Sequence, residues 1–216
     1  MPRASAGLAL VVLIFAAFVS QQSPKNIWEK QYKDRSAVDM AAQFENDSRP
    51  VYRHRADIIR LLELSPGMSV AEIGAGSGFL SRLAARSLGR SGRIIATELD
   101  PKMVDYMNER ARREGLTNFK AITGHVGRTG LDASSLDAIL IVNTFSFFDR
   151  PREMMLSVAE AMKPGGVLVV VDFPPSDGSG TAAETVIGIA RAAGLLLIDR
   201  SEAVPGHYAL RFRKTP

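Results

Sequence analysis

Cysteine is absent from the 216-residue sequence, which excludes disulfide bonds, thiolate metal sites and catalysis by a cysteine nucleophile. Charges of the two signs nearly balance: 27 basic and 23 acidic residues leave a formal net charge of only +4. No run of Lys and Arg points to a nucleic-acid partner. The hydrophobic fraction of 46% is that of an ordinary globular domain with a buried core.

The N-terminal segment carries no charged residue between Ala4 and Pro24, and residues 6–19 are continuously apolar or glycine. This run is short for a transmembrane helix and suits a signal peptide, although Phe15 and Phe18 stand where signal cleavage requires small residues. Residues 1–24 are therefore interpreted as a signal peptide or an N-terminal membrane anchor, with a buried helix as a third possibility. The basic residues that follow favour a tethered domain facing the cytoplasm, with export after cleavage as the alternative.

The remaining chain divides into residues 25–50, interpreted as a linker and irregular N-terminal cap, and residues 51–216, interpreted as one domain. A helix is expected from Pro50 through residue 64, where Ser-Pro-Gly ends it. Strands are expected at 69–74, 92–99, 118–124, 136–145, 166–173, 195–202 and 207–214. Helices are expected around the apolar stripe Leu80, Leu83, Ala84 and Leu88, and at 100–115, 151–163 and 181–193.

The alternation of apolar strands with helices predicts an α/β domain with a mostly parallel sheet covered on both faces. The last two strands are joined only by the short turn Val204-Pro205-Gly206, so the final strand must run antiparallel. Asp100 is expected to cap the helix that begins at Pro101, and Thr181 with Glu184 to form a capping box.

A glycine-rich turn follows the first strand in "VAEIGAGSGFL", with glycines at 74, 76 and 78. The nicotinamide fingerprint would place its third glycine at Phe79. Glu72, two residues before the first glycine, disfavours a pyrophosphate and suits a ligand with a cationic amino group. A nicotinamide-dependent oxidoreductase is therefore the least favoured interpretation.

Five segments in order, "VAEIGAGSGFL", "IIATELDPKMV", "FKAITGHV", "LDAILIVNTF" and "AMKPGGVLVVVDF", resemble the motifs of the class I S-adenosylmethionine-dependent methyltransferases. The resemblance covers roughly residues 50–213. It implies a Rossmann-like methyltransferase fold whose seven-stranded sheet has the order 3-2-1-4-5-7-6, with the last strand antiparallel and helices on both faces. It also implies S-adenosyl-L-methionine as the cofactor.

The resemblance assigns Glu72 and the glycine turn to the methionine half of the cofactor, Glu98 to the ribose hydroxyls and Leu99 to the adenine. His125 replaces an aspartate that binds the adenine amino group in many relatives, and Asn143 lies where cofactor and substrate meet. The cofactor-binding residues implied in this way are Glu72, Gly74, Ala75, Gly76, Gly78, Glu98, Leu99, His125, Val126 and Asn143.

No catalytic residue and no metal ligand is assigned, because the sulfonium is already activated and a dedicated base is not required. His54, Asp172 and His207 are candidates for a general base. Tyr52, Arg53 and Arg55 either reach over the cofactor or form a solvated basic helix face.

Three phenylalanines, Phe145, Phe147 and Phe148, follow the fourth strand and belong either to the core or to the acceptor pocket. In a pocket they would favour an apolar or aromatic small molecule over a nucleic acid. The sequence thus predicts an S-adenosylmethionine-dependent methyltransferase acting on a small molecule. A non-catalytic S-adenosylmethionine-binding protein is the alternative.

Overall fold

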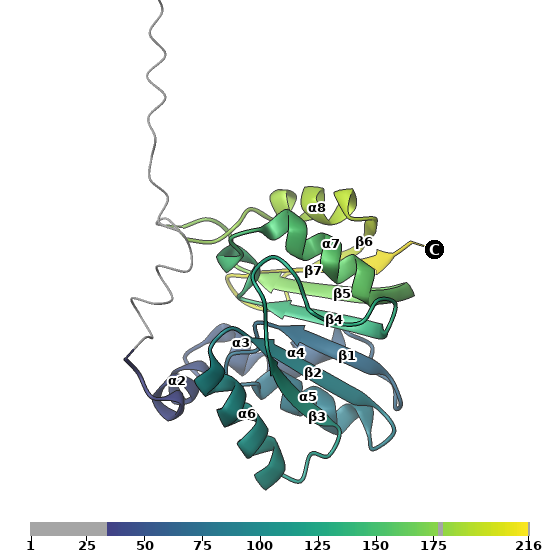
Figure 1. The fold of residues 1–216 in the computed structure, drawn as a ribbon. Helices are drawn as coiled ribbons and strands as arrows, with labels where there is room; N and C mark the ends of the chain where they lie inside the picture. The colour runs from purple at the N-terminus through teal and green to yellow at the C-terminus, as the bar shows by residue number, and fades with distance from the viewer. Residues whose placement is uncertain (1–33, 177–178, 216) are drawn as a thin grey trace, which may run out of the picture.

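A computed structural model describes residues 34–176 and 179–215. Its seven-stranded sheet has the order β3-β2-β1-β4-β5-β7-β6 (Figure 1), which confirms the predicted order. The strands are β1 (Ser69–Ile73), β2 (Arg93–Glu98), β3 (Phe119–Thr123), β4 (Leu136–Val142), β5 (Met162–Asp172), β6 (Leu195–Ser201) and β7 (Tyr208–Lys214). The helices are α2 (Ala37–Phe44), α3 (Pro50–Arg53), α4 (Arg55–Arg60), α5 (Phe79–Leu88), α6 (Pro101–Arg113), α7 (Pro151–Ala161), α8 (Ala183–Ala192) and the 3₁₀ turn η1 (Phe145–Phe147).

The first five strands are parallel, and β7 runs antiparallel to both β5 and β6, as predicted. Both faces of the sheet carry apolar side chains. Helices α7 and α8 cover one face, and α4, α5 and α6 cover the other. The parallel strands consequently end at one edge, and the loops that follow β1, β2, β3 and β4 converge there.

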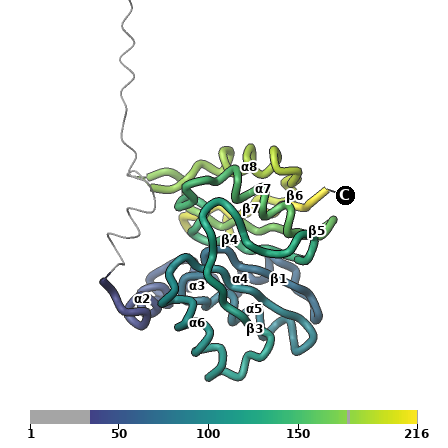
Figure 2. The backbone as a smooth tube through the Cα atoms, viewed as in Figure 1, coloured from purple at the N-terminus to yellow at the C-terminus, as the bar shows by residue number. Residues whose placement is uncertain are grey.

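The N-terminal cap is more regular than predicted, because residues 25–50 contain the helix α2 (Figure 2). Ser36 Oγ accepts a hydrogen bond from the Asp39 amide at 3.1 Å and so caps this helix. Met40, Ala41 and Phe44 form its buried side and attach α2 beside α6. The prediction of an irregular cap was wrong for residues 37–44, because a few apolar residues in a polar segment give only a weak helical pattern. Residues 25–33 lie outside the described part of the chain.

Three predicted helix boundaries were also wrong. The helix expected over 50–64 is interrupted at His54, which has non-helical backbone angles and bonds to the Asp57 side chain. The Thr181–Glu184 capping box does not form, because the Thr181 amide donates to the Phe173 carbonyl and α8 begins only after Ala182. Helix α7 ends at Ala161, and Met162 is the first residue of β5, paired with Leu136.

The predicted Asp100 cap is confirmed, since its carboxylate accepts from the Lys102 amide at 2.9 Å.

Within residues 34–176 and 179–215, no helix combines the length and the hydrophobicity required to cross a bilayer. The proposed signal peptide or anchor at residues 1–24 lies outside the described residues.

Candidate cofactor-binding site

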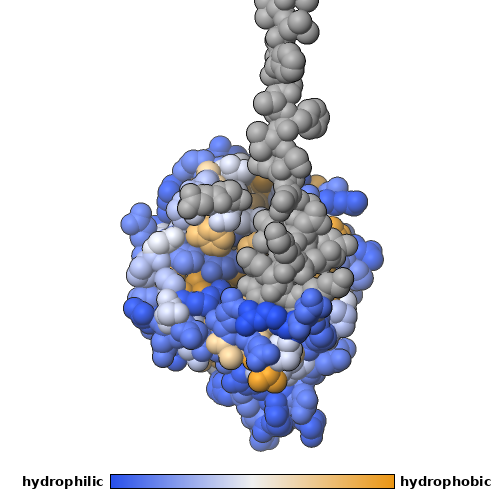
Figure 3. Space-filling model, turned by 90° about the vertical axis from the view of Figure 1, so that its left-hand side faces the viewer, coloured by the Kyte–Doolittle hydropathy of each residue, from blue (hydrophilic) through white to orange (hydrophobic). Residues whose placement is uncertain are grey.

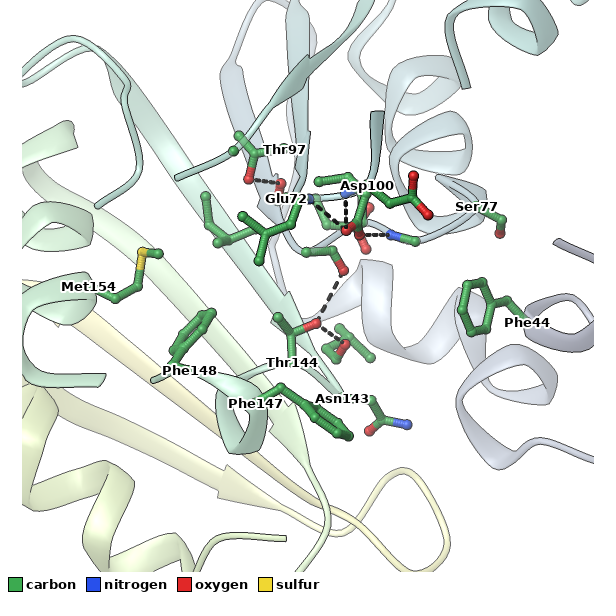
Figure 4. Close-up of a pocket in the computed structure, with 18 of the residues that line it drawn as sticks. Phe44, Glu72, Ser77, Thr97, Asp100, Asn143, Thr144, Phe147, Phe148 and Met154 are labelled. Atoms are coloured by element: carbon green, nitrogen blue, oxygen red, sulfur yellow. Dashed lines mark hydrogen bonds between the residues drawn. The ribbon is translucent and has the colours of Figure 1, made fainter. Parts of the chain in front are cut away.

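A pocket of about 560 Å³ opens at the carboxyl ends of β1, β2 and β4 (Figure 4). Figure 3 looks onto the end of the molecule where α2 lies, and hydrophobic patches there are surrounded by hydrophilic side chains. Nine of the ten residues implied by the resemblance line the pocket: Glu72, Gly74, Ala75, Gly76, Glu98, Leu99, His125, Val126 and Asn143. Gly78 is the exception. It caps the N-terminus of α5, and a Cβ there would lie 2.7 Å from Met107 Sδ.

The glycine turn has a backbone that only glycine adopts readily, with φ of +73° at Gly74 and +57° at Gly76. A Cβ on Gly74 would lie 2.2 Å from Thr144 Cγ2, and one on Gly76 would lie 3.2 Å from the Phe44 ring. The amides of Gly74 and Ala75 both donate to the Thr97 carbonyl, which bends the turn across the end of β2. The turn thereby exposes backbone to the pocket without side chains.

Glu98 holds this turn from the neighbouring strand. One carboxylate oxygen accepts from the Gly76 amide at 2.9 Å, and the other accepts from the amides of Leu99 at 2.6 Å and Asp100 at 3.3 Å. Burial raises the pKa of the Glu98 carboxyl, while the three amide bonds oppose that shift. Glu98 therefore lines the pocket and also connects the glycine turn to the end of β2 by hydrogen bonds.

Glu72 is the second carboxylate of the pocket and is only 2% exposed. Its side chain accepts a hydrogen bond from the Ser81 hydroxyl. Burial raises its pKa from 4.5 to about 8, and the negative charge of Glu98 adds to this effect. The pocket therefore presents a neutral acid at neutral pH, which can ionise beside a cation.

The pocket also contains polar atoms suited to a cofactor. Ser77 Oγ and Asn143 Oδ1 are buried and have no hydrogen-bond partner among the described residues. Asn143 has a φ of +49°, an uncommon conformation for a residue other than glycine. A side-chain-free bend, two carboxylates and two unpaired polar atoms fit a ligand with a cationic amino acid end and a hydroxylated nucleoside end.

Helix α2 contributes contacts to the site that sequence reasoning missed. Phe44 packs against Gly76, and Glu45 accepts hydrogen bonds from Arg82 at 3.1 Å and from Arg110 at 2.9 Å. Arg82 also donates to the Ser77 carbonyl at 2.8 Å, so one buried guanidinium links α2 to the glycine turn. The signal that could have revealed α2 is the capping pair Ser36 and Asp39 before a short apolar stripe.

Replacing Glu45 with glutamine is expected to lower the unfolding free energy by about 1–3 kcal/mol and to weaken cofactor binding. The reason is that the Arg82 side chain is 6% exposed and would keep only Glu114 as an ionic partner. Chemical denaturation and calorimetry with S-adenosylhomocysteine measure the two effects. Glu184→Gln, which breaks the exposed ion pair to Arg200, is the matched control. Equal losses in both variants would contradict the role given to Glu45.

The three candidates for a general base lie outside the pocket wall. His54 bonds to Asp57, and His207 Nδ1 lies 3.0 Å from the Pro205 carbonyl oxygen. Asp172 is fully buried and accepts from two backbone amides. None of these three residues lines the pocket, and their role as general-base candidates stays a prediction.

The basic residues before β1 do not reach over the pocket either. The Tyr52 ring packs edge-on against Phe79 with centroids 5.3 Å apart, and Arg55 stacks on Tyr52 at 4.4 Å. Arg53 donates to the Asp47 carbonyl. None of the three lines the pocket: Arg53 is exposed, and Tyr52 and Arg55 are half-buried.

The phenylalanines after β4 divide between the two expected roles. Phe145 is buried in the core, whereas Phe147 and Phe148 line the pocket with Met154 (Figure 4). One end of the pocket is thus polar, with Glu72 and Glu98, and the other is apolar.

A parallel α/β sheet with a glycine turn after β1 and carboxylates at the ends of β1 and β2 defines a protein that binds a nucleoside cofactor at its strand ends. Residues 70–166 match the family described as "Methyltransferase domain". This match, together with the methyltransferases described next, supports a class I S-adenosylmethionine-dependent methyltransferase domain with S-adenosylmethionine as its cofactor.

Curated relatives agree with this family. A protein-L-isoaspartate O-methyltransferase of Pyrobaculum neutrophilum is 28% identical over 53% of this chain and 53% of its own. A ubiquinone/menaquinone biosynthesis C-methyltransferase of Legionella pneumophila is 29% identical over 53% of this chain and 46% of its own. The chain therefore spans about half the length of these relatives. Among solved structures, an S-adenosylmethionine-dependent methyltransferase from Aquifex aeolicus shares the fold, with a TM-score of 0.73, 19% identity, and coverage of 83% of this chain and 98% of that one.

Proposed function

We propose that this protein transfers a methyl group from S-adenosylmethionine to a small apolar or aromatic molecule. The observation that carries the proposal is the continuity of the pocket: the carboxylates and the glycine turn lie at one end, and Phe147, Phe148 and Met154 lie at the other. An apolar wall is suited to a flat hydrophobic acceptor and excludes water from the transfer. Apolar acceptors are also consistent with relatives named for ubiquinone and menaquinone biosynthesis.

The chain's residues perform binding and orientation in this reaction. Glu72 would bind the ammonium of the cofactor, Glu98 would accept from its ribose hydroxyls, and Leu99, His125 and Val126 would hold the adenine; all five residues line the pocket. The cofactor supplies an activated methyl group. The nucleophile needs alignment opposite the sulfonium more than it needs a base, which agrees with the absence of the three base candidates from the pocket wall.

The test is methyl transfer from tritiated S-adenosylmethionine to a panel of phenols, quinols and prenylated aromatics, beside a peptide containing isoaspartate. Label in the organic phase with an aromatic acceptor is the expected result. Label only in the peptide would contradict the small-molecule acceptor, and cofactor binding without any transfer would favour the non-catalytic alternative. The matched control is Glu98→Ala, which should abolish the label.

We also propose that residues 1–24 tether the domain to a membrane on its cytoplasmic side, where S-adenosylmethionine is made. The proposal rests on the uncharged apolar run and on the basic residues after it. The full chain is expected in the membrane fraction and a chain lacking residues 1–24 in the supernatant, both measured by fractionation and immunoblotting. A shortened chain exported from the cytoplasm would support signal cleavage instead.

A further inference from the structure

The last residue of β5, Asp172, is fully buried outside the pocket wall and has a specific set of partners. One carboxylate oxygen accepts from the Ser146 amide at 3.0 Å, and the other accepts from the Phe173 amide at 2.8 Å. Burial raises the pKa of Asp172, and these two amides oppose the shift. The buried Asp172 carboxylate does not line the pocket but accepts a hydrogen bond from the chain that follows β4.

Ser146 is the central residue of the turn η1, and its amide has no partner within that turn. The next two amides are satisfied locally, because Phe147 donates to the Thr144 carbonyl at 2.9 Å and Phe148 donates to the Phe145 carbonyl at 3.1 Å. Asp172 is thus the acceptor that ties the middle of η1 to the sheet. Tyr208 lies opposite Asp172 in the β5–β7 register and is also buried.

The side chains of this turn divide between the core and the pocket. Phe145 is buried in the core and contacts the Phe148 ring edge-on, with centroids 5.5 Å apart. Phe147 and Phe148 face the pocket at its apolar end (Figure 4). A displacement of the Ser146 backbone would therefore move the wall against which an acceptor lies, whereas Thr144, two residues earlier, stays bonded to the Gly74 carbonyl at 3.1 Å.

We propose that Asp172 is a positioning residue for the methyl acceptor: through the Ser146 amide it fixes the turn that carries Phe147 and Phe148. The proposal rests on the proposed function, since it assigns the apolar end of the pocket to the acceptor. The contact between β5 and η1 does not involve Glu72 or Glu98, so Asp172 is expected to affect acceptor affinity more than cofactor affinity.

The test uses the full chain saturated with S-adenosylhomocysteine and 2-naphthol as a fluorescent apolar probe. Asp172→Asn keeps the side-chain shape but leaves one of two buried amides without an acceptor, so the dissociation constant of 2-naphthol should rise about tenfold. The dissociation constant of S-adenosylhomocysteine should change less than about twofold by the same argument. The control is Asp137→Asn, which disturbs a bond to the Ser69 amide and an ion pair with Lys163 at the amino ends of the strands, and should leave both constants unchanged.

Hydrogen exchange keeps the proposal testable if the variant folds poorly. In the wild-type protein the Ser146 amide should be as protected as the central amides of β5, and in Asp172→Asn the amides of residues 144–148 should exchange faster. A rapidly exchanging wild-type Ser146 amide, or equal losses of 2-naphthol affinity in the Asp172 and Asp137 variants, would overturn the proposal. A wild-type protein that binds no S-adenosylhomocysteine would instead contradict the proposed function.

Discussion

Glu98→Gln is expected to weaken binding of S-adenosylhomocysteine on the order of 100-fold, because a buried charged acceptor is replaced by a neutral group that also carries donors. In the structure the carboxylate already receives the amides of Gly76, Leu99 and Asp100. Glu98 also lines the pocket, where we place the ribose hydroxyls. The variant is therefore expected to lose contacts to the ligand and also to weaken the hydrogen bond that holds the glycine turn at Gly76. Isothermal titration calorimetry measures the effect.

Two further variants separate these causes. Glu98→Asp keeps the charge but retracts it, so its affinity should fall between those of the wild type and Glu98→Gln. Glu109→Gln alters an exposed carboxylate on α6 and should bind as the wild type does. Unchanged affinity in Glu98→Gln, with the protein folded by circular dichroism, would remove the basis for assigning the ribose to β2.

Binding of S-adenosylhomocysteine is expected to release a proton from Glu72 and to strengthen with pH. The ligand-free carboxyl has a pKa of about 8, and the ammonium of the ligand favours its ionised form. Affinity should therefore rise by up to about tenfold per pH unit between about pH 6 and 8, and then level off. Calorimetry at pH 7 in two buffers of different ionisation enthalpy measures the released proton.

The stability of the ligand-free protein should change in the opposite direction. A carboxyl whose pKa rises from 4.5 to about 8 on folding contributes stability that is fully present below pH 4.5 and is lost as the pH rises towards 8. The slope is about 1.4 kcal/mol per pH unit for one such group. Glu72→Gln should remove both the slope and the proton release. If it binds with the wild-type pH dependence, another group carries the effect.

Local chemistry makes much of the fold predictable from the sequence. The order of apolar strands and helices, the Asp100 cap and the short turn before β7 each reflect interactions between residues close in sequence, and all three are confirmed. The positions of Glu72, Glu98 and Asn143 follow from the same logic, because parallel strands end at one edge. The wrong boundaries, at His54 and Ala182, lie where a long-range or side-chain bond competes with the local pattern.

The sequence by itself determined the glycine turn and the acidic residues at the strand ends, since backbone conformation depends on residue type, and the resemblance of its motifs to the methyltransferases implied the strand order. Only the tertiary structure decided that α2 covers the turn through Phe44 and Glu45, and that Gly78 serves α5 rather than the pocket. It also placed Asp172 against the Ser146 amide in the chain after β4. These contacts join residues 26 to 37 positions apart, so they depend on packing that no local pattern records.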